Sequence, residues 1–131
     1  MNKFNLKSEA QREVLDWGTF GWLSHPPLTG SRKLMVTDVE VLPGKGHDFH
    51  KHPQQEEMII VVEGVVEQWI EQEKRILKPG DSAFMDADVI HASFNVGETP
   101  ARLIAVLSPC VGEIGYELVD VSDQAPWADL R

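Results

Sequence analysis

GKGHDFHKHPQQEEMIIVVEG, residues 44–64, is the stretch of sequence that decides the fold. It carries His50 and His52 one residue apart, and alternate side chains of a β-strand point to the same face, so the two imidazoles can converge on one point. Glu57 follows them, just before an apolar run. Imidazole nitrogen and carboxylate oxygen are ligands that suit a divalent transition metal. Together with His91 from further along the chain, these residues predict one metal site inside a small β-barrel.

The chain on both sides of this stretch has the pattern of short β-strands. Segments rich in β-branched residues recur about every ten residues, and turn signals such as Pro43-Gly44 and Pro79-Gly80 separate them. This spacing predicts an all-β sandwich or barrel. The expected strands cover residues 34–41, 47–52, 57–63, 65–71, 75–77, 82–85, 89–94 and 102–107, with 116–121 as a candidate for the last.

Two features of the central strands are specific predictions. Residues 57–63 are dominated by Met, Ile and Val, which is typical of a strand buried on both faces. Gly64 ends this segment and the apolar pattern returns at once, so Glu63-Gly64 is predicted to be a tight hairpin turn. Trp69 then lies on the partner strand, where a packing role is favoured over a place in a pocket wall.

The domain organisation follows from the absence of linkers and repeats. We expect one domain over residues 1–131, with an N-terminal arm at 1–33, the barrel at 34–121 and a tail at 122–131. Residues 8–15 either begin a short helix with Ser8 as its N-cap or form an irregular edge strand. The tail docks either on its own barrel or on a neighbour. Exposed Trp17, Trp22 and Trp127 would be buried most easily against a second subunit, which predicts a homodimer.

The composition sets the broad class of the protein. The 131 residues are 42% hydrophobic, the proportion of a globular domain. Lysine and arginine number 12 against 21 aspartates and glutamates, a net charge of −9 that disfavours nucleic-acid binding but not a metal cation. The longest apolar run, 58–62, is too short for a membrane span, and the N-terminus lacks the apolar core of a signal peptide. With one cysteine, Cys110, no internal disulfide can form, so we expect a cytoplasmic protein.

Two blocks of the sequence resemble the motifs of the cupin superfamily. The first motif, Gly-x5-His-x-His-x4-Glu-x6-Gly, is complete here, and its five fixed points make the resemblance specific. The second, Gly-x5-Pro-x-Gly-x2-His-x3-Asn, is matched in part, because Asp86 and Asp88 stand where the family has Pro and Gly. The matching residues are Gly44, His50, His52, Glu57 and Gly64 in the first block and Gly80, His91 and Asn95 in the second.

The resemblance implies a fold and a metal centre. The fold would be a double-stranded β-helix, a jelly-roll barrel of two packed sheets. The barrel mouth would hold one divalent metal, which ligand type alone leaves open among Fe, Mn, Ni, Zn and Cu. The aspartates put the geometry of the turn before His91 in question, because Asp adopts positive φ less readily than Gly. The implied ligands are His50, His52, Glu57 and His91.

The residue types allow a catalytic site. Three neutral imidazoles and one carboxylate leave a net positive metal with room for exchangeable ligands, unlike a closed structural site. Fe(II) or Mn(II) could take a bidentate substrate or dioxygen there, and Zn(II) could act as a Lewis acid. In the structural alternative, the three histidines are polar barrel residues without a metal. Glu56 is the competing carboxylate, but the motif spacing and strand alternation select Glu57.

Other polar residues near the motifs have open roles. His47 precedes the His50/His52 pair and is expected at the barrel mouth. Ser93 and Asn95 share the parity of His91, and a structural role is favoured for Asn95. No further general acid or base is indicated, so catalytic residues stay unassigned. We therefore expect a metal-dependent enzyme, of oxygenase or isomerase type, that acts on a small chelating molecule. The alternative is a cupin that binds a small ligand without turnover.

Overall fold

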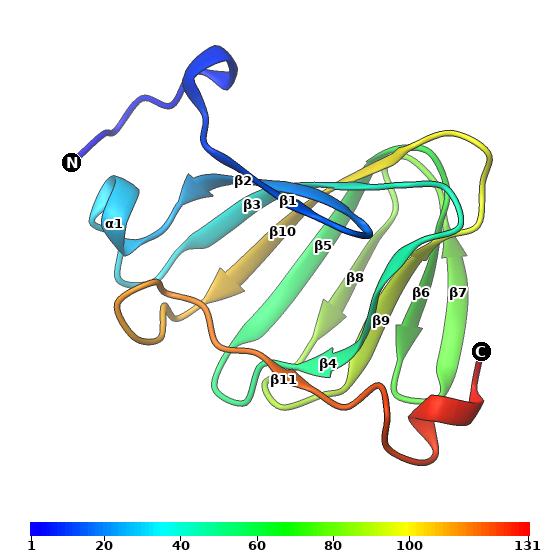
Figure 1. Ribbon diagram of the computed structural model, residues 1–131. Helices are drawn as coiled ribbons and strands as arrows, with labels where there is room; N and C mark the ends of the chain where they lie inside the picture. The colour runs from blue at the N-terminus through cyan, green and yellow to red at the C-terminus, as the bar shows by residue number, and fades with distance from the viewer.

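Two antiparallel sheets face each other in the computed structural model of the protein, which describes residues 1–131 (Figure 1). The six-stranded sheet has the order β1-β2-β3-β10-β5-β8, and the five-stranded sheet has the order β11-β4-β9-β6-β7. The all-β prediction is therefore confirmed. The strands are β1 Arg12–Leu15, β2 Gly18–Ser24, β3 Met35–Val41, β4 Gly46–Lys51, β5 Glu56–Glu63, β6 Val66–Ile70, β7 Glu73–Leu77, β8 Ser82–Met85, β9 His91–Asn95, β10 Ala101–Ser108 and β11 Val119–Asp120.

Short helical turns complete the fold. A 3-10 helix covers Lys7–Glu9, α1 covers Pro26–Thr29, and a second 3-10 helix covers Trp127–Asp129. No helix of the structure is long and apolar enough to cross a membrane.

The main core lies between the two sheets. Alternation along the strands turns every second side chain inward, and the clearest case is β10, whose side chains alternate strictly between buried and half-buried. Eleven buried residues form this core: Trp22, Met35, Ile59, Val61, Val66, Leu77, Met85, Ala101, Leu103, Ala105 and Leu107.

The prediction that residues 57–63 are buried on both faces is wrong. In β5, Ile59 and Val61 point into the core and are almost fully buried. Met58, Ile60 and Val62 point out of the barrel and are 36%, 39% and 37% exposed. An unbroken apolar run here therefore does not mean burial on both sides.

The predicted hairpin at Glu63-Gly64 is also wrong. β5 pairs with β10 and β8 in one sheet, whereas β6 pairs with β7 and β9 in the other. Gly64 has a φ of 78°, and an added Cβ would lie 2.9 Å from Cα of Ala101. The glycine thus marks the crossing of the chain from one sheet to the other, close against the start of β10. Trp69 consequently lies in the sheet opposite Glu57.

The first 33 residues contribute more than an arm. β1 forms the edge of the six-stranded sheet and β2 pairs with β3, so two strands precede the residues from which the strand pattern is evident. Of the two alternatives for residues 8–15, the edge strand is correct over Arg12–Leu15. The exposed side chains of β1 carry no burial alternation, which is why the pattern alone did not separate strand from helix.

The tail docks on its own barrel, over the outer face of the five-stranded sheet. A second buried cluster forms there around Phe49, and Trp127 and Leu130 pack against it (Figure 1, red segment). The guanidinium of Arg131 lies 3.8 Å from the ring centroid of Phe94, and its Nε donates to Glu67 at 2.8 Å. The buried members of this cluster are Phe49, Trp69, Ala92, Phe94 and Val121.

The tryptophans used to predict a homodimer are not freely exposed. Trp22 is only 9% exposed and stacks on His25 with ring centroids 3.9 Å apart. Trp17 stacks on His47, and Trp127 packs on Phe49. The argument from exposed tryptophans is therefore wrong, because each of the three indole rings packs on another ring of the same chain.

Candidate metal centre

The four predicted ligands are brought together between the sheets. Their ligand atoms all lie within 4.8 Å of one another, and the four residues are buried. His50 on β4 and His91 on β9 are cross-strand partners in the five-stranded sheet, and His52 follows the end of β4. Glu57 comes from β5 of the opposite sheet. The carboxylate and the imidazoles thus approach one point from the two walls of the barrel.

Backbone carbonyls set the orientation of all three imidazoles. Nδ1 of His50 lies 2.6 Å and Nδ1 of His91 lies 2.9 Å from the carbonyl oxygen two residues earlier in the chain. Nδ1 of His52 lies 2.6 Å from the carbonyl oxygen of Glu117. A carbonyl oxygen can only accept, so each Nδ1 carries the proton and donates. Each Nε2 is therefore left with a free lone pair, the arrangement found in metal-ligating histidines.

The contacts of Glu57 with His52 and His91 are of a kind that a bound cation stabilises. Nε2 of His91 lies 2.8 Å and Nε2 of His52 lies 3.1 Å from Oε1 of Glu57. Oε1 of Glu57 and Nε2 of His91 are buried without a hydrogen-bond partner. Lone pairs that face each other in this way need a shared proton or a metal. Neighbouring ligands of one ion, each about 2.1 Å from it, are themselves about 3.0 Å apart in octahedral and about 3.4 Å apart in tetrahedral geometry, so the residues fit a metal.

Burial and mutual contact shift the pKa values of the cluster. Burial acts to raise the pKa of Glu57, but the imidazoles of His91 and His52 outweigh it and hold this pKa well below its ordinary value. Burial acts to lower the pKa of His91, but the Glu57 carboxylate outweighs it and raises this pKa. Burial lowers the pKa of His50 well below 6.5 and that of His47 to about 4, with further lowering from neighbouring histidines. Without a metal, the Glu57 carboxylate and the His91 imidazole thus each favour the charged form of the other.

These shifts predict that the metal-free protein loses stability as the pH falls from 7 to 5. His47 and His50 have folded pKa values below the unfolded value of 6.5, so the unfolded chain takes up protons first and is favoured. His47 keeps some contact with solvent, so its share at pH 5 is on the order of 1 kcal/mol. Urea unfolding of chelator-treated protein at several pH values measures the effect.

The other two groups do not cancel this loss. His91 has a raised pKa, so its stabilising contribution is complete below 6.5 and is lost as the pH rises through the folded value. Glu57 has a lowered pKa, so its contribution is lost only as the pH falls below 4.5 toward the folded value. Two histidines have lowered pKa values and one has a raised pKa, so we expect a net loss of folding stability as the pH falls from 7 to 5. A urea midpoint that is constant or higher at pH 5 than at pH 7 would contradict these assignments.

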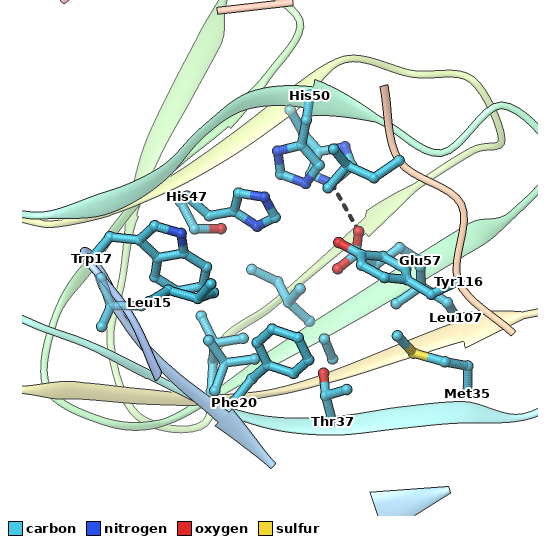
Figure 2. Close-up of a pocket in the computed structure, with 18 residues that line it drawn as sticks. Leu15, Trp17, Phe20, Met35, Thr37, His47, His50, Glu57, Leu107 and Tyr116 are labelled. Atoms are coloured by element: carbon cyan, nitrogen blue, oxygen red, sulfur yellow. Dashed lines mark ion pairs between the residues drawn. The ribbon is translucent and has the colours of Figure 1, made fainter. Parts of the chain in front are cut away.

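A cavity of about 290 Å³ opens beside the cluster (Figure 2). Of the four clustered residues, His50, Glu57 and His91 line it and His52 does not. Its remaining polar residues are Thr37, His47, Ser93 and Tyr116, and its other walls are apolar: Leu15, Trp17, Phe20, Met35, Val39, Val41, Ile59, Leu103, Ala105, Leu107 and Leu118.

The other residues considered for the site lie in different places. Glu56 is exposed on the outer face of β5, so it does not take part. Ser93 lines the cavity and donates to Oε1 of Gln68 at 2.5 Å. Asn95 is structural, since its amide donates to the carbonyl oxygens of Val41 and Thr99 at 2.9 and 2.8 Å.

The turn before His91 tolerates its aspartates. Asp88 adopts a φ of 70°, the left-handed conformation in which the motif has glycine. Its backbone N–H donates to the carbonyl oxygen of His52 at 3.0 Å, and its carboxylate lies 3.1 Å from Nζ of Lys51. These contacts hold the turn against the end of β4, so the ligand position is retained without glycine.

Sequence patterns did not establish a role in the site for three residues that contribute to it. Gln55 is buried, and its amide donates to the carbonyl oxygens of Pro109 and Gly115 at 2.8 and 2.9 Å. It thereby fixes the loop that carries Tyr116 and the carbonyl group that orients His52. Tyr116 and Trp17 both line the cavity. No local signal marks these residues, because each acts through contacts distant in sequence.

Known proteins resemble this chain in sequence or in fold. The curated relative polyketide synthase CurC from Streptomyces cyaneus is 33% identical over 86 residues, 62% of this chain and 56% of that protein. The chain thus spans little more than half of that relative. The solved structure of KdgF from Halomonas sp. is 24% identical, with a TM-score of 0.73 over 83% of this chain and 94% of that chain. Oxalate decarboxylase from Lactobacillus farciminis, in a formate complex, is 17% identical, with a TM-score of 0.76 over 90% and 39% of the two chains.

The family assignment rests on the strands that carry the cluster. A cupin-domain family model matches residues 37–107, more than half of the chain. This range contains β4, β5 and β9, and so all four clustered residues. The double-stranded β-helix implied by the two sequence motifs is also the fold shared with the structural relatives. The chain therefore belongs to the cupin family.

Proposed function

We propose that His50, His52, Glu57 and His91 ligate one divalent transition metal and that the protein is a metal-dependent enzyme of oxygenase or isomerase type. The observation that carries this proposal is the orientation of the imidazoles. Three Nδ1–H groups donate to backbone carbonyls, and two of the Nε2 atoms left free, those of His52 and His91, lie 3.1 and 2.8 Å from one buried carboxylate oxygen. Such a set is costly to bury without a cation.

The bound metal would supply Lewis acidity and, if it is iron or manganese, redox chemistry with dioxygen. The chain's own residues bind and orient the substrate. Apolar side chains from β3 and β10 keep the chamber dry, which strengthens the polar interactions inside it. His47 and Tyr116 have no hydrogen-bond partner within the protein and can offer hydrogen bonds to a substrate beside the ligands.

A cavity next to the ligands favours an enzyme over a structural metal site, because a structural site is closed. The substrate would be a small molecule that reaches the metal with oxygen atoms. The name of the relative CurC, a polyketide synthase, supports an oxygen-rich carbon skeleton as a candidate class. The alternative remains a cupin that holds such a molecule without turnover.

The test compares metal-free protein with protein reconstituted with Fe(II), Mn(II), Ni(II) or Zn(II). Oxygen uptake and product formation are followed over a panel of diols and flavonols. We expect turnover with at least one metal and none after chelation. Glu57→Gln should abolish it, and Glu56→Gln on the outer face is the matched control that keeps it. Binding of panel compounds without any turnover would favour the alternative function.

A homodimer and a cytoplasmic location stay predictions. The outer face of β5 offers a second copy an apolar surface formed by Met58, Ile60 and Val62 together with Phe84 of β8. Sedimentation at micromolar concentration would distinguish a dimer from a monomer.

A further inference from the structure

The cavity beside the metal ligands lacks a counter-charge for an anion. Among all the residues that line it, Glu57 is the only carboxylate, and there is neither lysine nor arginine. Sites that bind phosphate or several carboxylates use Arg or Lys to compensate the buried charge. A small dianion would therefore depend on the metal alone for its counter-charge, in a chamber whose other walls are mostly apolar.

His47 presents one edge of its ring to this chamber. One face of the imidazole stacks on Trp17, with centroids 4.9 Å apart and planes at 12°. The other face stacks on His50, with centroids 3.7 Å apart and planes at 12°. Both faces are thus covered, and the ring nitrogens have no protein partner. Figure 2 shows His47 between Trp17 and the Glu57 end of the cavity. The stacking holds a hydrogen-bonding edge in a fixed orientation.

Tyr116 offers a second neutral polar group near Glu57. Its ring packs edge-on against Trp22 at 6.4 Å between centroids and lies 5.1 Å from the ring of His52. Its hydroxyl has no hydrogen-bond partner in the protein, and the side chain lines the cavity (Figure 2). These two neutral hydrogen-bonding groups accompany the metal ligands, together with the hydroxyl-bearing Thr37 and Ser93, and the other lining residues are apolar.

We propose that the cavity takes a neutral, largely apolar ring compound that reaches the metal through two neighbouring oxygens, with His47 and Tyr116 as the specificity-determining residues. This inference rests on the proposed metal site. One ring nitrogen of neutral imidazole donates and the other accepts, and a phenol does both. The pair therefore matches the hydroxyl and carbonyl oxygens of a phenol, an enol or a hydroxyketone. Small dianions such as oxalate or a sugar phosphate are disfavoured.

Calorimetric titration of the Zn(II)-loaded full chain tests the ligand class. The probes are naphthalene-2,3-diol, 2-naphthol, oxalate and glucose 6-phosphate. We expect the diol to bind at least about tenfold more tightly than 2-naphthol, which lacks the second oxygen, and than either anion. Equal or tighter binding of oxalate or glucose 6-phosphate would overturn the proposal. Failure of the protein to take up zinc and every other candidate ion would instead contradict the metal site itself, so the two failures are distinguishable.

Variants test the two specificity residues. His47→Phe keeps the stacking and removes the nitrogens, and Tyr116→Phe removes only the hydroxyl. Each should weaken diol binding by about 3- to 10-fold with zinc content unchanged. His47→Gln keeps a donor and an acceptor and should bind more tightly than His47→Phe. Val14→Ala, at an 82% exposed position of β1, is the control with unchanged binding. Wild-type affinity in both phenylalanine variants would overturn the assignment.

Discussion

The His91→Ala variant is expected to lose its metal while the barrel stays folded. His91 supplies one of four converging ligand atoms, and its Nε2 is the partner nearest to Glu57, at 2.8 Å. Loss of a residue that merely supports a ligand lowers metal affinity by about 10- to 100-fold, so loss of a ligand should cost more than about 100-fold. His50→Ala should behave in the same way. Elemental analysis after gel filtration measures the bound metal.

A matched histidine and a thermal measurement control this experiment. His47 stacks on His50 but is not one of the four clustered residues, so His47→Phe should retain wild-type metal content. Metal binding stabilises the folded state by mass action. Added Zn(II) should therefore raise the melting temperature of the wild-type protein and of His47→Phe but not of His91→Ala. Unchanged metal content in His91→Ala would show that the ligand assignment is wrong.

The Phe49→Ala variant is expected to have the largest effect on stability, a loss of about 3–5 kcal/mol in the free energy of unfolding. Phe49 is 1% exposed, and its ring centroid lies 5.6 Å from that of Trp69 and 5.7 Å from that of Trp127. It is adjacent to His50 on β4 but faces the opposite side of the sheet. Urea unfolding measures the loss.

Two further measurements show whether the stability lost in Phe49→Ala comes from the cluster around Phe49. Phe84 is 46% exposed on the outer face of the other sheet. Its replacement by alanine should lower the free energy of unfolding by less than about 1 kcal/mol. A double-mutant cycle of Phe49→Ala with Trp127→Ala should give a coupling of about 0.5–1.5 kcal/mol, because the tail ring packs on the strand ring. A zero coupling would contradict docking of the tail.

The alternation of side chains made the site predictable from sequence. His50 and His52 share a face because the strand period is two, and the spacing to Gly64 selects Glu57 over Glu56. The structure brings the predicted residues together and turns Glu56 outward. Local periodicity was sufficient here because the prediction required only which side chains of a single strand point into the barrel.

Strand pairing was not predictable in the same way. A glycine after an apolar strand marks a change of direction, but it does not specify whether the next strand joins the same sheet. At Gly64 the chain crosses to the opposite sheet, because β5 finds its partners β10 and β8 much later in the sequence. The roles of Gln55 and Tyr116 were not predictable for a related reason. Gln55 joins the start of β5 to the loop before β11, and Tyr116 of that loop lies against Trp22 and His52.

Metal content of the untagged protein, purified anaerobically, tests the central claim most directly. We predict one equivalent of a divalent transition metal per chain, either as isolated or after reconstitution and removal of excess ion. Iron, manganese or nickel would direct the choice of reactions to screen, and zinc or copper would equally support the ligand set. Absence of bound metal after reconstitution with each of these ions would contradict the proposed site.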